Sequence, residues 1–260
     1  ANMAEAQSMT VQLADITIAI EPDNESDSVR IEEYYLPFSS DAAPQITIRV
    51  FRSAMPPIFP MAADMIFESA DMWSLYRIEG KHCFVQRHAG AHAVPDRILV
   101  CESDFRHCDL FVRAAASEQE SALELPNPLD YPLGQILMLC YLAQGRGLMV
   151  HACGIEHEGK GYLFAGNSGH GKSTMAELWQ NDARILTDER LILRLRNDEI
   201  WMYGTPWRGD FPDSSPSGVR LDKVFFLRSG SDNMSSPATG TEASALLLGR
   251  SFPPFWDKDG

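Results

Sequence analysis

Residues 166–174 read Gly166-Asn167-Ser168-Gly169-His170-Gly171-Lys172-Ser173-Thr174. This stretch fits the pattern GxxxxGK[ST] in full, which is the pattern of a phosphate-binding loop between a strand and a helix. The glycines permit positive φ, so that successive N–H groups and the start of the helix can face the same phosphate oxygens. Lys172 would place its charge beside the β- and γ-phosphates, and the Ser173 hydroxyl would bind Mg²⁺. We therefore expect the whole stretch to bind ATP with Mg²⁺.

The sequence on both sides of this loop predicts alternating strands and helices. Residues 175–180 continue the loop as a helix, and short apolar runs predict strands at residues 148–153, 161–165, 185–187 and 191–195. Strand, glycine loop, helix and strand is the order of a phosphate-binding α/β unit. The expected fold class is therefore α/β (α+β) for this part of the chain.

The first 125 residues or so have a different pattern, which predicts a mainly β module. Short runs rich in β-branched residues predict strands at residues 11–20, 45–51, 75–78, 83–87 and 97–101. After Leu125-Pro126-Asn127-Pro128 the spacing becomes helical over residues 129–143. We place the boundary near Pro126, which gives a mainly β module at 1–126 and a nucleotide-binding domain at 127–260.

Composition excludes several classes of function. The formal net charge is −14 and no run of Lys and Arg occurs, which argues against a nucleic-acid partner. No apolar stretch reaches the roughly 18 residues of a membrane helix, and the N-terminus lacks the pattern of a signal peptide. The five cysteines show no CxxC spacing, which predicts reduced, buried thiols in a cytoplasmic protein. The sequence leaves a homo-oligomer open.

A second group of chemically active residues follows the loop at Leu186-Thr187-Asp188-Glu189-Arg190. Proteins with a phosphate-binding loop need a carboxylate near this point, to hold the metal or to orient the attacking group. Two adjacent acids could divide that work, with one on Mg²⁺ and one on the proton of the nucleophile. The alternative is a solvated turn of charged residues.

These residues resemble the catalytic domain of HPr kinase/phosphorylase, a family that phosphorylates a serine on a small carrier protein. The family has a histidine in the strand before the loop, as His151 is here, and an Asp-Asp-Arg that resembles Asp188-Glu189-Arg190. The resemblance covers roughly residues 147–227 and includes Trp207-Arg208-Gly209. The chain departs from the family at Thr174, Glu189 and Pro206, where the family has Glu, Asp and Glu.

The resemblance implies a fold related to that of phosphoenolpyruvate carboxykinase, with a mostly β nucleotide-binding core. It also implies roles for individual residues. Lys172 holds the phosphates, and Ser173 and Glu189, beside Asp188, hold Mg²⁺. Asp188 accepts the proton of the incoming hydroxyl, His151 orients that acid, and Arg208 stabilises charge on the transferred group.

The expected function is that of an ATP-dependent kinase, which transfers the γ-phosphate to a serine or similar hydroxyl of a protein or peptide. Two alternatives stay open. One is a nucleotide-binding regulatory module that transfers nothing, and the other is a small-molecule kinase. The departures from the family also leave open whether the substrate is a carrier protein and whether phosphorolysis occurs.

Overall fold

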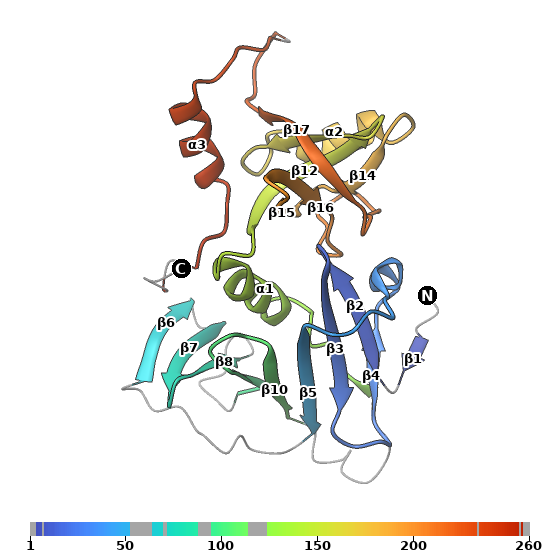
Figure 1. Cartoon of the computed structure of the whole chain (residues 1–260), viewed down its shortest axis with the longest axis vertical. Helices are drawn as coiled ribbons and strands as arrows, with labels where there is room; N and C mark the ends of the chain where they lie inside the picture. Colours follow the sequence, from blue (N-terminus) through green and yellow to red (C-terminus); the bar gives the residue numbers. More distant parts are fainter. Residues whose placement is uncertain are drawn as a thin grey trace. The chain divides into compact units, whose positions relative to one another are not determined.

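The computed structural model describes residues 4–6, 8–52, 64–69, 72–87, 95–113, 124–232, 234–254 and 256. The chain forms two compact units, of which the first is mainly Ile16–Tyr141 and the second mainly Leu142–Pro254 (Figure 1). The sequence predicts an earlier boundary, near Pro126. The helix α1 (Leu133–Ala143) falls almost wholly in the first unit, which moves the boundary to its C-terminal end.

The first unit is built on an eight-stranded sheet and a small three-stranded sheet. In spatial order the large sheet contains β2 (Met9–Leu13), β3 (Ile16–Pro22), β5 (Ile46–Arg52), β10 (His107–Val112), β9 (Arg97–Cys101), β8 (Lys81–Gln86), β7 (Trp73–Ile78) and β6 (Met65–Ser69). The small sheet contains β1 (Ala4–Ala6), β4 (Ser28–Ile31) and β11 (Glu124–Leu125), and a 3₁₀-helix, η1, spans Glu33–Phe38. The mainly β character expected of this region is present.

Alternating burial along β2 and β5 shows how these strands form, because every second side chain enters the core. Cys101 and Cys108 are directly opposite on β9 and β10 and form a disulfide. The expectation that all five cysteines are reduced is therefore wrong for this pair. Cys83, Cys140 and Cys153 are free and buried, as expected.

The second unit is a closed five-stranded barrel. Its strands pair in the order β12 (Leu148–His157), β13 (Lys160–Ala165), β17 (Gly218–Phe226), β16 (Glu199–Tyr203) and β15 (Arg190–Arg196), and β15 pairs with β12 again. β14 (Arg184–Thr187) also pairs with β12. Apolar side chains from these strands form one core cluster, with members such as Val150, Leu163, Leu186, Leu191 and Met202.

Two hairpin turns explain why the barrel is mostly antiparallel. Glu158 and Gly159 have φ of 52° and 74°, and Asn197 and Asp198 have φ of 49° and 62°. Two consecutive residues with positive φ are typical of the tightest hairpin connections. These turns join β12 to β13 and β15 to β16, so that β13 and β17 form the one parallel pair among the described strands of this unit.

The fold class expected from the sequence, an α/β (α+β) P-loop kinase fold, is wrong, because the chain is mostly β, with a five-stranded barrel and large mixed sheets. Of the described residues, 44% lie in strands and 16% in helices. Helix α2 (Lys172–Trp179) follows the loop, as expected, and α3 (Gly240–Leu248) lies near the end of the unit. Hairpins join β12 to β13 and β15 to β16. In an α/β unit, crossover helices would join neighbouring parallel strands. In the described part of the chain, no helix is long and apolar enough to cross a membrane.

Candidate functional site

Strand β12 is the element on which the candidate site is assembled. Along one edge it pairs first with β15, through His151 and Arg190, and then with β14, through Gly154 and Thr187. Asp188 and Glu189 occupy the break between β14 and β15. Along the other edge, β12 pairs with β13 from Ala152 onward. β13 ends at Ala165, so the glycine loop begins close to both acids.

The loop has the backbone shape that an anion seat requires. Gly169 and Gly171 have φ of 77° and 93°, in the left-handed region that favours glycine. Gly171 is the N-cap residue of α2 and has no side chain that could accept hydrogen bonds from the first-turn amides. Nδ1 of His170 lies 3.1 Å from the carbonyl oxygen of Leu227, which ties the loop to the end of β17. The loop therefore has the left-handed glycine conformation that anion-binding loops use.

Lys172 is folded over the loop. Its Nζ donates hydrogen bonds of 3.1 Å to the carbonyl oxygens of Gly166 and Asn167, and the residue is only 6% exposed. Burial lowers the pKa of Lys172, whereas the carboxylates of Glu189 and Asp188 act in the opposite direction. The ammonium group thus sits within the loop on two neutral acceptors, which an anion could replace.

Asp188 is the buried centre of the site. Its Oδ1 accepts a 2.7 Å hydrogen bond from the Gly209 amide, and its Oδ2 accepts from the Ser173 hydroxyl at 2.7 Å and the Phe211 amide at 3.0 Å. The residue is 1% exposed. A Cβ at position 209 would lie 2.9 Å from Oδ2 of Asp188, so the close approach requires glycine there. Asp188 therefore joins α2 to the segment at residues 209–211.

Glu189 is held by two partners at the pocket wall. Its Oε2 lies 2.8 Å from Nε2 of His151, and its Oε1 accepts a hydrogen bond from Arg190. Burial by itself would raise the pKa of Glu189, but the His151 hydrogen bond and the charge of Arg190 outweigh it and lower the pKa to about 2. Glu189 is therefore a fixed negative charge at any ordinary pH.

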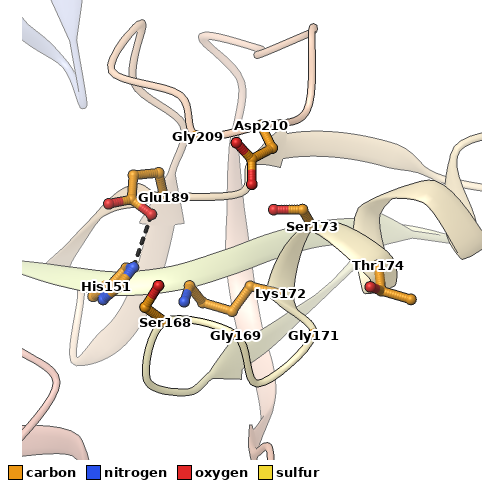
Figure 2. A pocket seen from close by; sticks show the side chains of 10 residues that line it. All are labelled: His151, Ser168, Gly169, Gly171, Lys172, Ser173, Thr174, Glu189, Gly209 and Asp210. Carbon is orange, nitrogen blue, oxygen red and sulfur yellow. Dashed lines mark hydrogen bonds and ion pairs between the residues drawn. The ribbon is translucent and has the colours of Figure 1, made fainter.

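Part of the loop, with Lys172, Glu189 and His151, lines a pocket of about 500 Å³, a volume that suits a small-molecule ligand. Figure 2 shows the Ser173 hydroxyl and the Asp210 carboxylate on one side, Glu189 with His151 on another, and the Lys172 ammonium beside Ser168. The lining residues are His151, Ser168, Gly169, Gly171, Lys172, Ser173, Thr174, Glu189, Gly209 and Asp210.

The structure brings most of the predicted site residues together. His151, Glu189 and the loop residues Ser168, Gly169 and Gly171–Thr174 line the pocket. Gly166, Asn167, His170, Asp188 and Arg208 are not among the residues that line it. The carbonyl oxygens of Gly166 and Asn167 accept hydrogen bonds from Lys172. Arg208 is exposed to solvent.

Gly209 and Asp210 are the two pocket residues that were not predicted from the sequence as site residues, and Asp210 is the one with a side chain that can bind a ligand. It is exposed and follows Gly209 directly, so the only available signal was an acid next to the Trp207-Arg208-Gly209 stretch. Within the described ranges, the pocket included, no cluster of three or more His, Cys, Asp or Glu side chains is placed to hold a metal ion.

No model of a known protein family matches the chain, and no curated protein matches it either.

Proposed function

We propose that the pocket binds ATP with Mg²⁺ and transfers the γ-phosphoryl group to a hydroxyl of a protein or peptide. The observation that carries the proposal is the convergence of four kinds of group on one pocket. These are the glycine-loop backbone, the Lys172 ammonium, the Ser173 hydroxyl and the two carboxylates Glu189 and Asp210. Together they provide the positive charge, the metal ligands and the acceptor site that phosphoryl transfer needs.

Lys172 and the loop would hold the phosphates. The ammonium now binds two neutral carbonyl oxygens, at 3.1 Å each. Hydrogen bonds between a charged donor and a charged acceptor are roughly twice as strong as neutral ones. A phosphate oxygen would therefore displace the carbonyl oxygens, while the amides at the start of α2 bind the same group.

The residues present fit a magnesium ion. Mg²⁺ prefers oxygen ligands, and is commonly held by one or two carboxylates together with substrate phosphates. The Ser173 hydroxyl, the Asp210 carboxylate and, through Ser173, the buried Asp188 form such an oxygen-rich set. When bound, Mg²⁺ would neutralise charge that develops on the transferred group.

We assign Glu189 to the incoming hydroxyl. It lines the pocket, whereas both oxygens of Asp188 already accept hydrogen bonds and the residue is 1% exposed. His151 and Arg190 each hold one oxygen of Glu189, which leaves further lone pairs for the hydroxyl. Its pKa of about 2 makes it a weak base. Phosphoryl transfer depends mainly on positioning and electrostatic stabilisation, so orientation of the hydroxyl is its main task.

A transfer assay tests this proposal. Wild-type protein is incubated with Mg²⁺, ATP labelled in the γ-phosphate, and a library of serine- and threonine-containing peptides. We expect label on peptides and release of ADP. Glu189→Gln should keep the affinity for ATP and lose transfer on the order of 10²-fold, the cost of a misplaced reacting group. ATP that does not bind to the wild-type protein would contradict the proposal.

One observation favours the second candidate, a nucleotide-binding module that transfers nothing. Glu189 has a low pKa, and Asp188 is buried and accepts three hydrogen bonds, so neither member of the predicted acid pair is a strong base. The same assay distinguishes the two, because this candidate predicts tight binding of ATP with all label retained on the nucleotide. Transfer to small hydroxyl compounds alone would identify a small-molecule kinase. The cytoplasmic location and the homo-oligomer remain predictions, as does the role of Arg208.

A further inference from the structure

We propose that Phe252, in the segment Arg250–Phe252, is a positioning residue for the candidate site. Its ring holds Arg190 and His151, and through them Glu189, in the arrangement that phosphoryl transfer requires. The proposal rests on the proposed function and assigns a role to a part of the chain that lies far from the loop in sequence.

The segment extends the barrel at the point where β13 ends. Val150 and Ser251 form an antiparallel bridge, the His151 amide donates to the Arg250 carbonyl at 2.7 Å, and the Phe252 amide donates to the Met149 carbonyl at 2.9 Å. β13 pairs with β12 only from Ala152 onward, because the chain turns away into the glycine loop. The segment therefore pairs with the part of β12 that carries His151.

The segment is also fixed from its N-terminal side. It follows α3 directly, and the Ser251 hydroxyl donates a 2.7 Å hydrogen bond to the carbonyl of Leu248 at the end of that helix. Leu247 of α3 packs against the core cluster of the barrel. The segment is therefore held by β12 through its backbone and by α3 through Ser251, and both elements belong to the second unit. This fixes the position of Phe252.

The Phe252 ring meets both groups that hold Glu189. The guanidinium carbon of Arg190 lies 4.4 Å from the centre of the ring, which is a cation–π contact. The His151 ring lies 6.2 Å from it, centre to centre, with an angle of 41° between the planes. Arg190 binds Oε1 of Glu189, and His151 binds Oε2. One aromatic side chain therefore supports both anchors of the pocket carboxylate.

Support of this kind matters because transfer depends on where Glu189 points. A flexible arginine loses less freedom on binding when its planar group is already held, and a ring face does this for guanidinium better than an aliphatic side chain. A misplacement of about 1 Å in a reacting group can cost on the order of 10²-fold in rate. Loss of the ring should therefore slow transfer without weakening the phosphate seat around Lys172.

The test compares three full-length variants with the wild type. Phe252→Leu removes the ring but keeps apolar bulk, and Phe252→Tyr keeps the ring. Phe225→Leu is the matched control, since Phe225 stacks on Phe164, 4.9 Å away, in the same unit and does not line the pocket. We measure the affinity for MgATP and the turnover rate. Phe252→Leu should lower turnover between about tenfold and about a hundredfold and leave affinity within about twofold. The other two variants should match the wild type.

A double-mutant cycle tests whether Phe252 acts through Arg190. In an Arg190→Gln background, Phe252→Leu should cause a smaller further loss of turnover than in the wild type, because the cation–π contact is already absent and only the contact with His151 is left to remove. Independent, multiplying losses would overturn the proposal. Wild-type turnover in Phe252→Leu would overturn it too, as would equal losses of affinity and turnover, which indicate general damage.

A readout that needs no activity separates this proposal from the proposed function. The imidazole signals of His151 are assigned in NMR spectra by comparison with His151→Gln. They should move in Phe252→Leu and stay in place in Phe252→Tyr and Phe225→Leu. Unchanged signals in Phe252→Leu would refute the contact, whether or not the protein binds ATP. If the contact is confirmed and the wild type binds no ATP, the proposed function alone fails.

Discussion

The Ser173 hydroxyl, in the first turn of α2, donates a 2.7 Å hydrogen bond to Oδ2 of Asp188, which lies in the break between β14 and β15. The same carboxylate accepts hydrogen bonds from the Gly209 and Phe211 amides. One buried acid therefore connects the start of the loop helix to the segment that carries Asp210. The site keeps its shape through this acid, while Glu189 and Asp210 face the pocket.

Replacement of Asp188 should destabilise the protein. Asn at this position presents an NH₂ group where the carboxylate accepts a hydrogen bond, so at least one buried donor loses its partner. Each such loss costs about 1–3 kcal/mol. We expect Asp188→Asn to lower the free energy of unfolding in urea by that amount. Asp213→Asn is the control, because Asp213 is exposed, and it should match the wild type. Equal stability of Asp188→Asn and the wild type would show that the three hydrogen bonds contribute nothing.

Asp210→Asn should leave stability nearly unchanged and weaken the binding of Mg²⁺. Asp210 is exposed at the pocket, so its replacement should change the free energy of unfolding by no more than about 0.5 kcal/mol. If Asp210 binds Mg²⁺, the variant should need more Mg²⁺ for half-maximal binding of ATP. A magnesium titration at fixed ATP measures this directly. An unchanged midpoint would remove Asp210 from the metal site.

Glu189 should make stability depend on pH at the acidic end. Burial would raise its pKa, but His151 and Arg190 lower it from 4.5 to about 2. A lower pKa in the folded state means that the carboxylate stabilises the fold above the unfolded pKa, and that this stabilisation is lost as pH falls from about 4.5 to about 2. The difference in unfolding free energy between wild type and Glu189→Gln should therefore be largest near neutral pH and shrink toward pH 2. A difference that does not change with pH would contradict the ion-pair network.

Much of the strand pattern could be predicted from the sequence. Alternation at residues 97–101 and 45–51 corresponds to β9 (Arg97–Cys101) and β5 (Ile46–Arg52). The loop and its flanking strand and helix are also where the pattern predicts them, because glycines with positive φ and an apolar strand are local features. The conformation of these elements depends on a few neighbouring residues, so their own sequence is sufficient to predict them.

The fold class could not be predicted in the same way. The order strand, loop, helix, strand fits an α/β unit, yet the strands pair in a mostly antiparallel barrel. The turn at Glu158-Gly159 was a local signal for a hairpin, and Asn197-Asp198 was another. Strand β17 (Gly218–Phe226) was missed because apolar and polar residues do not alternate regularly along the whole of its sequence. It closes the barrel by pairing with β13, which is far from it in sequence.

In the candidate site, too, the features that depend on neighbouring residues could be predicted, and those that depend on long-range contacts could not. The loop residues and the acid pair are contiguous in sequence, so a pattern could identify them. The distinction between Asp188 and Glu189 could not be predicted, because it depends on amides that come from Gly209 and Phe211. Phe252 carries no motif at all, and its place beside Arg190 arises from the pairing of its segment with β12.

The most direct test of the central claim is the affinity of the purified chain for ATP in the presence of Mg²⁺, measured by titration calorimetry for the wild type and for Lys172→Ala. The loop is proposed to hold the triphosphate through its backbone amides and the Lys172 ammonium. We therefore predict saturable binding to the wild type, and an affinity lower by about tenfold to a hundredfold in the variant, as expected for loss of a charged hydrogen bond. No binding to the wild type, or equal affinity in the two proteins, would contradict the account.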